Sequence, residues 1–380
     1  MAAPELKEVR IGIIGPSWWV DYWHLPALLR HPRARITGVA GAKDRPPHEV
    51  ATKFGESVRY FTRASSMLDE THPVGVVVCT PNDLHFPSTM EALERGIHVI
   101  CEKPLALNAE QAKTMTRAAE EAGLIGMTNF PYRANPCVNA FRRLLAEGAI
   151  GDMVHITGEY HGGFGLRGWP GWRGLRERSG AGILGDLGSH LIDLTRYVTG
   201  LEFDAVTASL LTLNRKPDGA PARVPTSSPE AGERNDDSCA FIAALSNGSQ
   251  AILHTSWLAH QGAYHQHQRL EAYGTGGRIE FLATHKGSYL RRMPIGVTEW
   301  DTLELEGVTD PSAGLADEDL FRPGRHDSTS TTWRFVEAIA NGDRSASPTF
   351  ADGWRAQQVI DAVVAAGEQR RWVEVDRTGR

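Results

Sequence analysis

Short, continuous runs of apolar residues alternate with segments of helical pattern over the first third of this chain of 380 residues. Such continuous runs are typical of parallel strands that helices cover on both faces. We expect strands at residues 9–14, 36–40, 74–79, 97–101 and 124–128. Helices are expected at 25–30, at 87–95 and from the N-cap Asn108 to Gly123. This order predicts a doubly wound, parallel α/β domain over residues 1–130.

The pattern changes after a helix expected at 138–147, because strands then follow one another directly. They are expected at 153–160, 205–213, 239–245, 250–257, 269–273 and 278–282, with Asn247-Gly248 as a hairpin turn. One helix, at 182–198, interrupts them, and residues 216–234 are expected to form a surface loop. Helices at 333–340 and 354–366 precede a last strand at 372–375. We predict a second, α+β domain over 131–380 with a large, mostly antiparallel open sheet, whose C-terminal helices could pack back on the first domain.

The composition and charge of the chain argue against some classes of protein. The chain has 41% hydrophobic and 23% charged residues, and a net charge of −6 gives no basic field for nucleic acid. The longest apolar runs have the length of strands, and the N-terminus is polar, so we expect a soluble, cytoplasmic protein without membrane contact. The four cysteines form neither a disulfide framework nor a zinc spacing, and we expect no metal.

Glu102-Lys103-Pro104 follows directly on the apolar run 97–101, one strand-helix unit after Cys79-Thr80-Pro81-Asn82. Ligands of open parallel sheets bind at the carboxyl ends of the strands. An isolated lysine after a strand is usually a surface residue, but this position makes Lys103 the first catalytic candidate.

The loop after the first strand resembles a dinucleotide fingerprint with imperfect spacing. It follows a strand and precedes a helix, but Ser17 and Val20 stand where the second and third glycines are expected after Gly15. Ser17 could still offer a backbone N–H and a hydroxyl to a phosphate. Trp18 and Trp19 could line the pyrophosphate or pack on the edge of the sheet.

The tip of the second strand bears on the choice of cofactor. An NAD enzyme usually has a carboxylate there for the ribose hydroxyls, whereas this chain has Gly41, with Lys43 and Arg45 close by. The pattern favours NADP over NAD, although Asp44, if displaced by one turn, would reverse that preference.

Asp186, His190 and Asp193 share one face of the helix expected at 182–198. A histidine beside carboxylates is a plausible general base, while a solvated helix face or an Asp/His metal pair are the alternatives. The segment 167–178 interleaves arginines with tryptophans, which suits a sugar ring or an anionic group as well as an ordinary surface loop.

Several motifs in order resemble the Gfo/Idh/MocA oxidoreductases, which are named for glucose-fructose oxidoreductase and inositol 2-dehydrogenase. The resemblance covers nearly the whole chain and implies a Rossmann domain followed by an α+β domain. The matching motifs are Gly12-Ile13-Ile14-Gly15, His24-Leu25-Pro26-Ala27-Leu28, Cys79-Thr80-Pro81-Asn82 with His85, Glu102-Lys103-Pro104, Gly148-Ala149-Ile150-Gly151, Trp172-Arg173 and 182–193.

In that family the lysine of Glu-Lys-Pro and an Asp-x3-His pair form the catalytic set, which implies Lys103, Asp186 and His190 here. The predicted cofactor contacts are Gly12, Gly15, Ser17, Trp18, Trp19, Gly41, Lys43, Thr80, Pro81, Asn82, His85, Glu102, Lys103, Asn129, Trp172 and Arg173. The predicted substrate contacts are Tyr132, Arg133, His161, Arg173, Asp186 and His190.

The resemblance implies an NAD(P)-dependent enzyme that oxidises a secondary alcohol, or reduces a ketone, of a sugar, cyclitol or related polyol. Two other functions stay open: a glycosidase of the same fold that oxidises its sugar transiently, and a sugar or nucleotide sensor without chemistry. An open sheet face in the second domain favours a homodimer or homotetramer.

Overall fold

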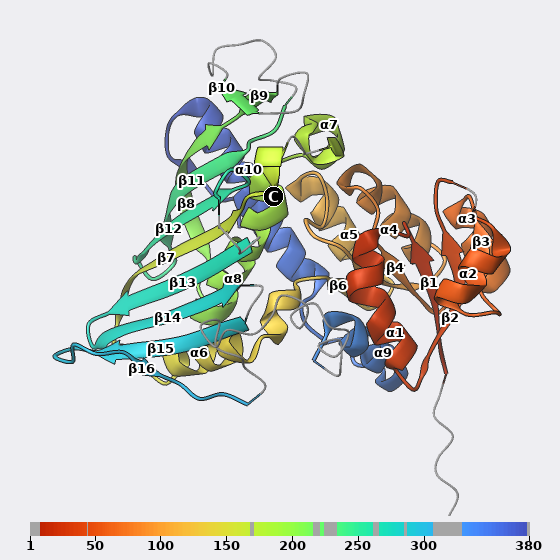
Figure 1. The fold of residues 1–380 in the computed structure, drawn as a ribbon, viewed down its shortest axis with the longest axis horizontal. Coiled ribbons are helices and arrows are strands. Elements are labelled where there is room, and N and C mark those ends of the chain that lie inside the picture. The colour runs from red at the N-terminus through yellow and green to blue at the C-terminus, as the bar shows by residue number, and fades with distance from the viewer. Residues whose placement is uncertain are drawn as a thin grey trace, which may run out of the picture. The chain divides into compact units, whose positions relative to one another are not determined.

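The structure is a computed structural model, which describes residues 8–43, 45–167, 171–215, 221–223, 234–260, 266–284, 287–306 and 329–377. Contacts divide the chain into two compact units (Figure 1). The first unit takes residues 1–131 and 322–354, and the second takes 132–321 and 355–380. Among the described residues, no helix combines the length and the apolar character needed to cross a membrane.

The first unit contains a six-stranded parallel sheet in the order β3-β2-β1-β4-β5-β6. This is the strand order of dinucleotide-binding domains, with a switch point between β1 and β4, and it confirms the predicted fold class. The strands are β1 (Val9–Ile14), β2 (Ala34–Ala40), β3 (Arg59–Phe61), β4 (Gly75–Val78), β5 (His98–Cys101) and β6 (Gly126–Thr128). The helices are α1 (Leu25–Arg30), α2 (Pro47–Phe54), α3 (Ala64–Thr71), α4 (His85–Leu93), α5 (Ala109–Glu121) and α9 (Thr331–Asn341), with a π-helical segment η1 (Val20–His24) and the 3₁₀ turn η2 (Asn82–Leu84). The 3₁₀ turn η3 (Pro131–Ala134) begins at the last residue of the unit's first segment and belongs mostly to the second unit.

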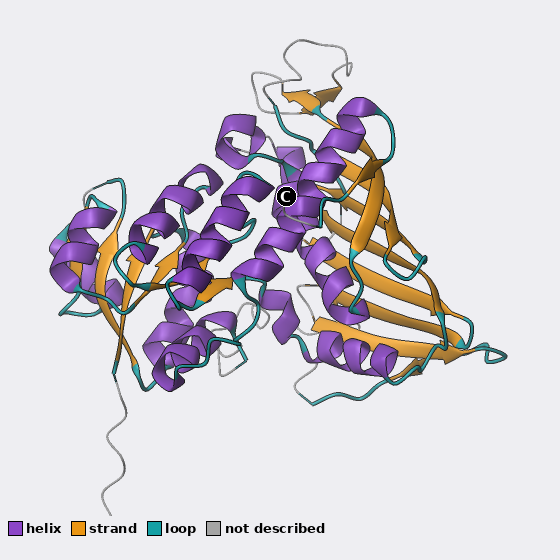
Figure 2. Cartoon of the chain, turned by 180° about the vertical axis from the view of Figure 1, so that it is seen from behind, coloured by secondary structure: helices purple, strands orange, loops and turns teal. Residues whose placement is uncertain are grey.

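Helices cover both faces of this sheet (Figure 2), which explains the unbroken apolar runs. Alternate residues of each strand belong to separate cores: Ile11 and Val77 to one cluster, Val76 and Val78 to the other. Phe335 of the C-terminal helix α9 joins the first cluster, so a distant segment completes this unit.

The second unit contains a nine-stranded sheet in the order β16-β15-β14-β13-β7-β12-β11-β8-β17. Every neighbouring pair is antiparallel except β7 and β12, as predicted for a mostly antiparallel sheet. The strands are β7 (Met153–Gly162), β8 (Phe203–Leu211), β11 (Ser238–Leu245), β12 (Gln250–Ser256), β13 (Gln266–Gly274), β14 (Gly277–Thr284), β15 (Gly287–Pro294), β16 (Asp301–Thr302) and β17 (Val373–Glu374). The helices are α6 (Pro136–Ala146), α7 (Arg176–Ser179), α8 (Ser189–Thr199) and most of α10 (Phe350–Gln369), with η4 (Phe164–Arg167), η5 (Gly171–Gly174) and η6 (Leu184–Gly188).

Helices cover one face of this sheet, as Figures 1 and 2 show. Along β7, Ile156 and Tyr160 are buried on the face with the helices, whereas Glu159 and His161 lie on the other face. We call this second face the outer face. The predicted hairpin is confirmed, because Gly248 has a φ of +86° in the turn between β11 and β12.

Two segments differ from the expected elements. The helix expected at 182–198 starts instead with the π-helical turn η6, and only Ser189–Thr199 is α-helical. Asp236 explains this start, since its carboxylate accepts the N–H groups of Gly182 and Leu184 at 2.8 Å each. Within the expected loop 216–234, Pro221–Arg223 (β10) pairs with Leu213–Arg215 (β9), while 216–220 and 224–233 lie outside the described residues.

Candidate active site

The loop after β1 has the backbone of a dinucleotide-binding turn at its first glycine. Gly15 has a φ of +87°, and a Cβ there would lie 2.6 Å from the carbonyl oxygen of Cys79, so only glycine fits. Ser17 accepts the N–H of Val20 at 3.3 Å, which caps the first turn of η1. A cofactor's phosphates would meet the positive end of this turn, so the residues present fit a dinucleotide.

Two further glycines of the predicted site are needed for close packing. A Cβ on Gly12 would lie 2.9 Å from the sulfur of Met67 on α3. A Cβ on Gly41 would lie 2.4 Å from the hydroxyl of Tyr60 and 2.8 Å from the ring of Pro16. An acidic side chain at position 41 would therefore require Tyr60 and Pro16 to move. This close packing around Gly41 could not be predicted from the sequence.

Trp18 and Trp19 have different surroundings. Trp18 is 65% exposed. Trp19 donates its indole N–H to Glu102 Oε1 at 2.8 Å and stacks on Trp23 with 5.9 Å between the ring centroids. Of the two interpretations of this pair, packing applies to Trp19, whereas the contact of Trp18 with the pyrophosphate stays a prediction.

Lys103 comes directly after β5, at the carboxyl end of the sheet, and follows a buried carboxylate. Its backbone N–H donates to Glu102 Oε2 at 3.3 Å, and Glu102 is 5% exposed. Burial alone would raise the pKa of Glu102, but the hydrogen bond and the charge of His24 outweigh burial and hold this pKa below its ordinary value. Lys103 therefore follows an ionised carboxylate within the first unit.

His85 supports the two turns at the ends of β4 and β5. Its Nδ1 lies 2.9 Å from the carbonyl oxygen of Pro104, and its Nε2 lies 3.0 Å from that of Thr80. The side chain is 1% exposed, and burial lowers its pKa. We predicted a cofactor contact for His85, but the ring lies behind the Thr80-Pro81-Asn82 turn, so its role is to hold this turn.

Asn129 and Glu102, both predicted to contact the cofactor, contact each other. Asn129 is fully buried, donates to Glu102 Oε1 at 2.5 Å and accepts a hydrogen bond from Thr331. Ligand atoms of His24, Cys79 and Glu102 also lie within 4.8 Å of one another. Both nitrogens of His24 already face hydrogen-bond partners, so we interpret this group as a hydrogen-bonded network and assign no metal to it.

In the second unit, His190 lies among aromatic hydroxyls. It is 4% exposed, and its ring packs edge-on against Tyr132 with 4.7 Å between centroids. Tyr132 and Tyr160 share a hydrogen bond of 2.5 Å, and Tyr160 donates to Gln266 at 2.9 Å. Tyr160 and Gln266 were not predicted, because only the packing of α8 on β7 brings Tyr160 to this histidine, and only the pairing of β7 with β13 brings Gln266 to Tyr160.

Asp186 and Arg173 lie together in the same unit. Asp186 is in the π-helical turn η6, and Arg173 Nε lies 3.5 Å from its Oδ1. The Arg173 guanidinium also lies 4.4 Å from the centroid of the Trp172 ring. Arg173 therefore places a positive charge next to the carboxylate of Asp186, one of the two residues of the predicted Asp-His catalytic pair. Trp169 of the same segment lies outside the described residues.

Arg133, which we predicted to contact the substrate, has a buried structural partner. Arg133 donates from Nε and Nη2 to both oxygens of Asp193, at 2.9 and 2.5 Å, and the two side chains are 6% and 1% exposed. This buried bidentate pair occupies Arg133, which we expected to bind substrate. Asp193 likewise pairs with Arg133 and does not extend the Asp186 and His190 face.

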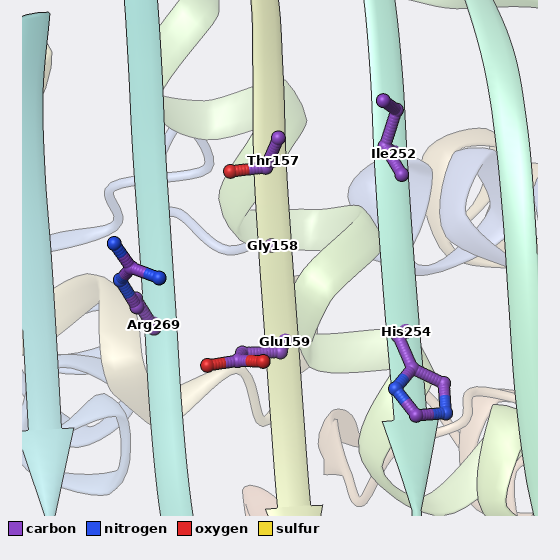
Figure 3. A pocket seen from close by; sticks show the side chains of 6 residues that line it. All are labelled: Thr157, Gly158, Glu159, Ile252, His254 and Arg269. Carbon is purple, nitrogen blue, oxygen red and sulfur yellow. The ribbon is translucent and has the colours of Figure 1, made fainter.

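His161 lies on the outer face of the sheet, opposite to its neighbour Tyr160, so the predicted substrate contact is not retained. Its Nε2 lies 2.9 Å from Nδ1 of His254. His254 and Glu159 line a pocket of about 230 Å³ on this face (Figure 3). Burial lowers the pKa of His161 to about 4, so this imidazole is neutral at neutral pH.

Comparisons with known proteins agree with this architecture. Residues 9–130 match the family model for the oxidoreductase family with an NAD-binding Rossmann fold, and residues 138–280 match the GFO/IDH/MocA C-terminal domain. Levoglucosan dehydrogenase of Pseudarthrobacter phenanthrenivorans is 29% identical, over 97% of this chain and 99% of that protein. Inositol 2-dehydrogenase of Rhizobium meliloti is 27% identical over the same shares.

A solved structure gives the same result for the fold. Levoglucosan dehydrogenase in complex with NADH and levoglucosan superposes with a TM-score of 0.80 and 26% identity, covering 98% of this chain and all of that one. This chain is therefore a member of the Gfo/Idh/MocA family of oxidoreductases.

Proposed function

We propose that this chain is a nicotinamide-dependent dehydrogenase or reductase that acts on a secondary alcohol or ketone of a sugar, cyclitol or related polyol. The observation that carries the proposal is the position of Lys103 at the carboxyl end of β5, in a sheet of dinucleotide-binding order. The sugar and inositol dehydrogenases among the relatives support the substrate class.

The proposed chemistry is an exchange of one proton and one hydride at a single carbon. The bound nicotinamide supplies the hydride acceptor or donor. His190 takes the proton of the substrate hydroxyl, and Lys103 hydrogen-bonds the same oxygen and stabilises the alkoxide charge that develops there. Asp186, held by Arg173, orients the substrate, and Tyr132 beside His190 contributes a further hydroxyl.

The cofactor is proposed to be NADP or NAD, with a modest preference for NADP. Lys43 is exposed after β2, and its carbonyl oxygen accepts the hydroxyl of Tyr60 at 2.8 Å, which fixes the backbone at this strand tip. No carboxylate stands at Gly41 to repel a 2′-phosphate. Among the relatives, levoglucosan dehydrogenase was solved with NADH, and IolW of Bacillus subtilis is named as an NADP(+) enzyme.

The test is a panel of sugars, cyclitols and glycosides with NAD and with NADP, followed by the absorbance of the reduced cofactor and by any released aglycone. The proposal predicts net reduction of the cofactor by at least one polyol, with the higher kcat/KM for NADP. Aglycone release without net reduction would instead indicate the redox-neutral glycosidase. No change with any compound, for a preparation that binds cofactor, would favour a sensor.

A further inference from the structure

A buried hydrogen-bond network lies behind Lys103 in the first unit, and the proposed chemistry does not use it. Its centre is Glu102, whose Oε1 accepts three donors: Trp19 Nε1 at 2.8 Å, His24 Nε2 at 2.9 Å and Asn129 Nδ2 at 2.5 Å. The other oxygen, Oε2, accepts the backbone N–H of Lys103 at 3.3 Å. One carboxylate therefore binds groups from two distant segments of the chain, at residues 19–24 and at Asn129, together with the backbone of its own neighbour.

These donors come from the elements that the cofactor would contact. Trp19 belongs to the loop after β1, and Asn129 follows β6. His24 and Asn129 are both fully buried, and each also contacts the first turn of α9: His24 Nδ1 lies 2.8 Å from Thr332 Oγ1, and Asn129 accepts the hydroxyl of Thr331. The helix α9 thus contacts the network through the hydroxyl groups of Thr331 and Thr332.

The surroundings of Glu102 favour the ionised form of its carboxyl group. The pKa of Glu102 lies below its ordinary value although burial opposes this, because His24 and Asn129 donate to the ionised form. His24 carries a proton on Nε2, since the carboxylate of Glu102 can only accept, and its Nδ1 faces the hydroxyl of Thr332. Loss of Glu102 would leave three donors, two of them on fully buried side chains, without this acceptor, which is costly, whereas loss of one donor leaves Oε1 with the other two.

We infer that Glu102, His24 and the indole N–H of Trp19 are positioning residues, which hold the loop after β1 at a fixed place relative to Lys103. This inference rests on the proposed function. None of the three is assigned a contact with the reacting atoms. Their effect is geometric, and displacement by about 1 Å of groups that align a reaction can cost on the order of a hundredfold in rate.

The test compares Trp19→Phe, which removes the indole donor but keeps an aromatic ring, with Glu102→Gln, Glu102→Ala and His24→Gln. Trp372→Phe is the matched control, because Trp372 is 51% exposed in the second unit. Binding of NADH and NADPH is followed by fluorescence, and the reactivity of the Lys103 amine is followed by acetylation and mass spectrometry. Both measurements work without a known substrate, so they separate this inference from the proposed function.

We expect Trp19→Phe and His24→Gln to weaken cofactor binding by about tenfold and to change the labelling rate of Lys103, with little change in Tm. Glu102→Gln should bind cofactor better than Glu102→Ala, since it keeps the acceptor oxygen. Trp372→Phe should match the wild type. The inference is overturned if Trp19→Phe and His24→Gln bind cofactor and label like the wild type, or if they lower only Tm. Even if the position 102 variants fail to fold, these two variants decide the question.

Discussion

Arg133 shows how a residue with a suitable side chain can serve the fold instead of the substrate. Its guanidinium is held by both oxygens of Asp193 in a nearly solvent-free position. The sequence places Arg133 near a predicted site, but only the packing of η3 and α6 next to α8 brings the carboxylate of Asp193 to it. The same holds for Glu102, whose partners lie up to 83 positions away.

We predict that Arg133→Leu destabilises the protein by about 3–5 kcal/mol, because it leaves the buried carboxylate of Asp193 without its partner. Urea unfolding monitored by circular dichroism measures this. Arg133→Leu combined with Asp193→Leu should recover part of the loss. A stable Arg133→Leu protein with a raised KM for substrate would show instead that the arginine binds substrate.

At His190, we predict a change in the pH dependence of turnover. His190→Ala should lose the acidic limb of the profile, where protonation blocks a group that accepts the hydroxyl proton, because the proton acceptor is gone. Tyr132→Phe, which keeps the ring beside His190, should retain that limb. The measurement is kcat/KM from pH 5 to 9 for both variants. An unchanged profile for His190→Ala would assign the base to another group, with Tyr132 the next candidate.

The alternation of strands and helices, the Asn108 cap and the Asn247-Gly248 hairpin could be predicted at the level of elements, because each depends on neighbours in sequence. The segment 45–71 could not, since α2, β3 and α3 are short and largely polar. The π-helical turns η1 and η6 also escaped prediction. They depend on tertiary hydrogen bonds, such as those of Asp236, and not on a period in the sequence.

We predict that His161, on the outer face of the large sheet, makes the second unit sensitive to acid. His161 has a folded pKa of about 4 against 6.5 in the unfolded chain, so the unfolded state takes up the proton first as the pH falls. Stability is therefore present above pH 6.5 and decreases below it, by about 2 kcal/mol at pH 5.

Thermal unfolding at pH 7.5 and pH 5 measures this, with His161→Gln as the comparison. Glutamine can still donate to His254 but does not titrate. The wild type should lose more Tm between the two pH values than the variant. Equal losses would show that His161 does not cause the acid sensitivity.

At the scale of the whole molecule, the outer face of the large sheet is less apolar than we expected. Glu271 and Glu280 are almost fully buried there in a network with arginines, such as Arg269. Ile242 and Ile252, a cross-strand pair on β11 and β12, are 40% and 45% exposed. We propose that a second copy covers this pair, in a two-fold contact.

The prediction is a dimer or tetramer of the wild type by light scattering at micromolar concentration. Ile252→Lys should shift the mass toward the monomer, since it places a charge in the contact, while Ile295→Lys, at an exposed position outside the strands, should not. A monomeric wild type would contradict the proposed assembly.

The central claim is that Lys103 acts on the reacting oxygen, and single-turnover hydride transfer by Lys103→Met tests it most directly. Methionine keeps the length of the side chain but removes its charge. With a substrate identified by the panel, we predict that the variant binds cofactor as the wild type does and transfers hydride about 10²–10³-fold more slowly, a loss of about 2.7–4 kcal/mol. Hydride transfer at the wild-type rate would contradict the account.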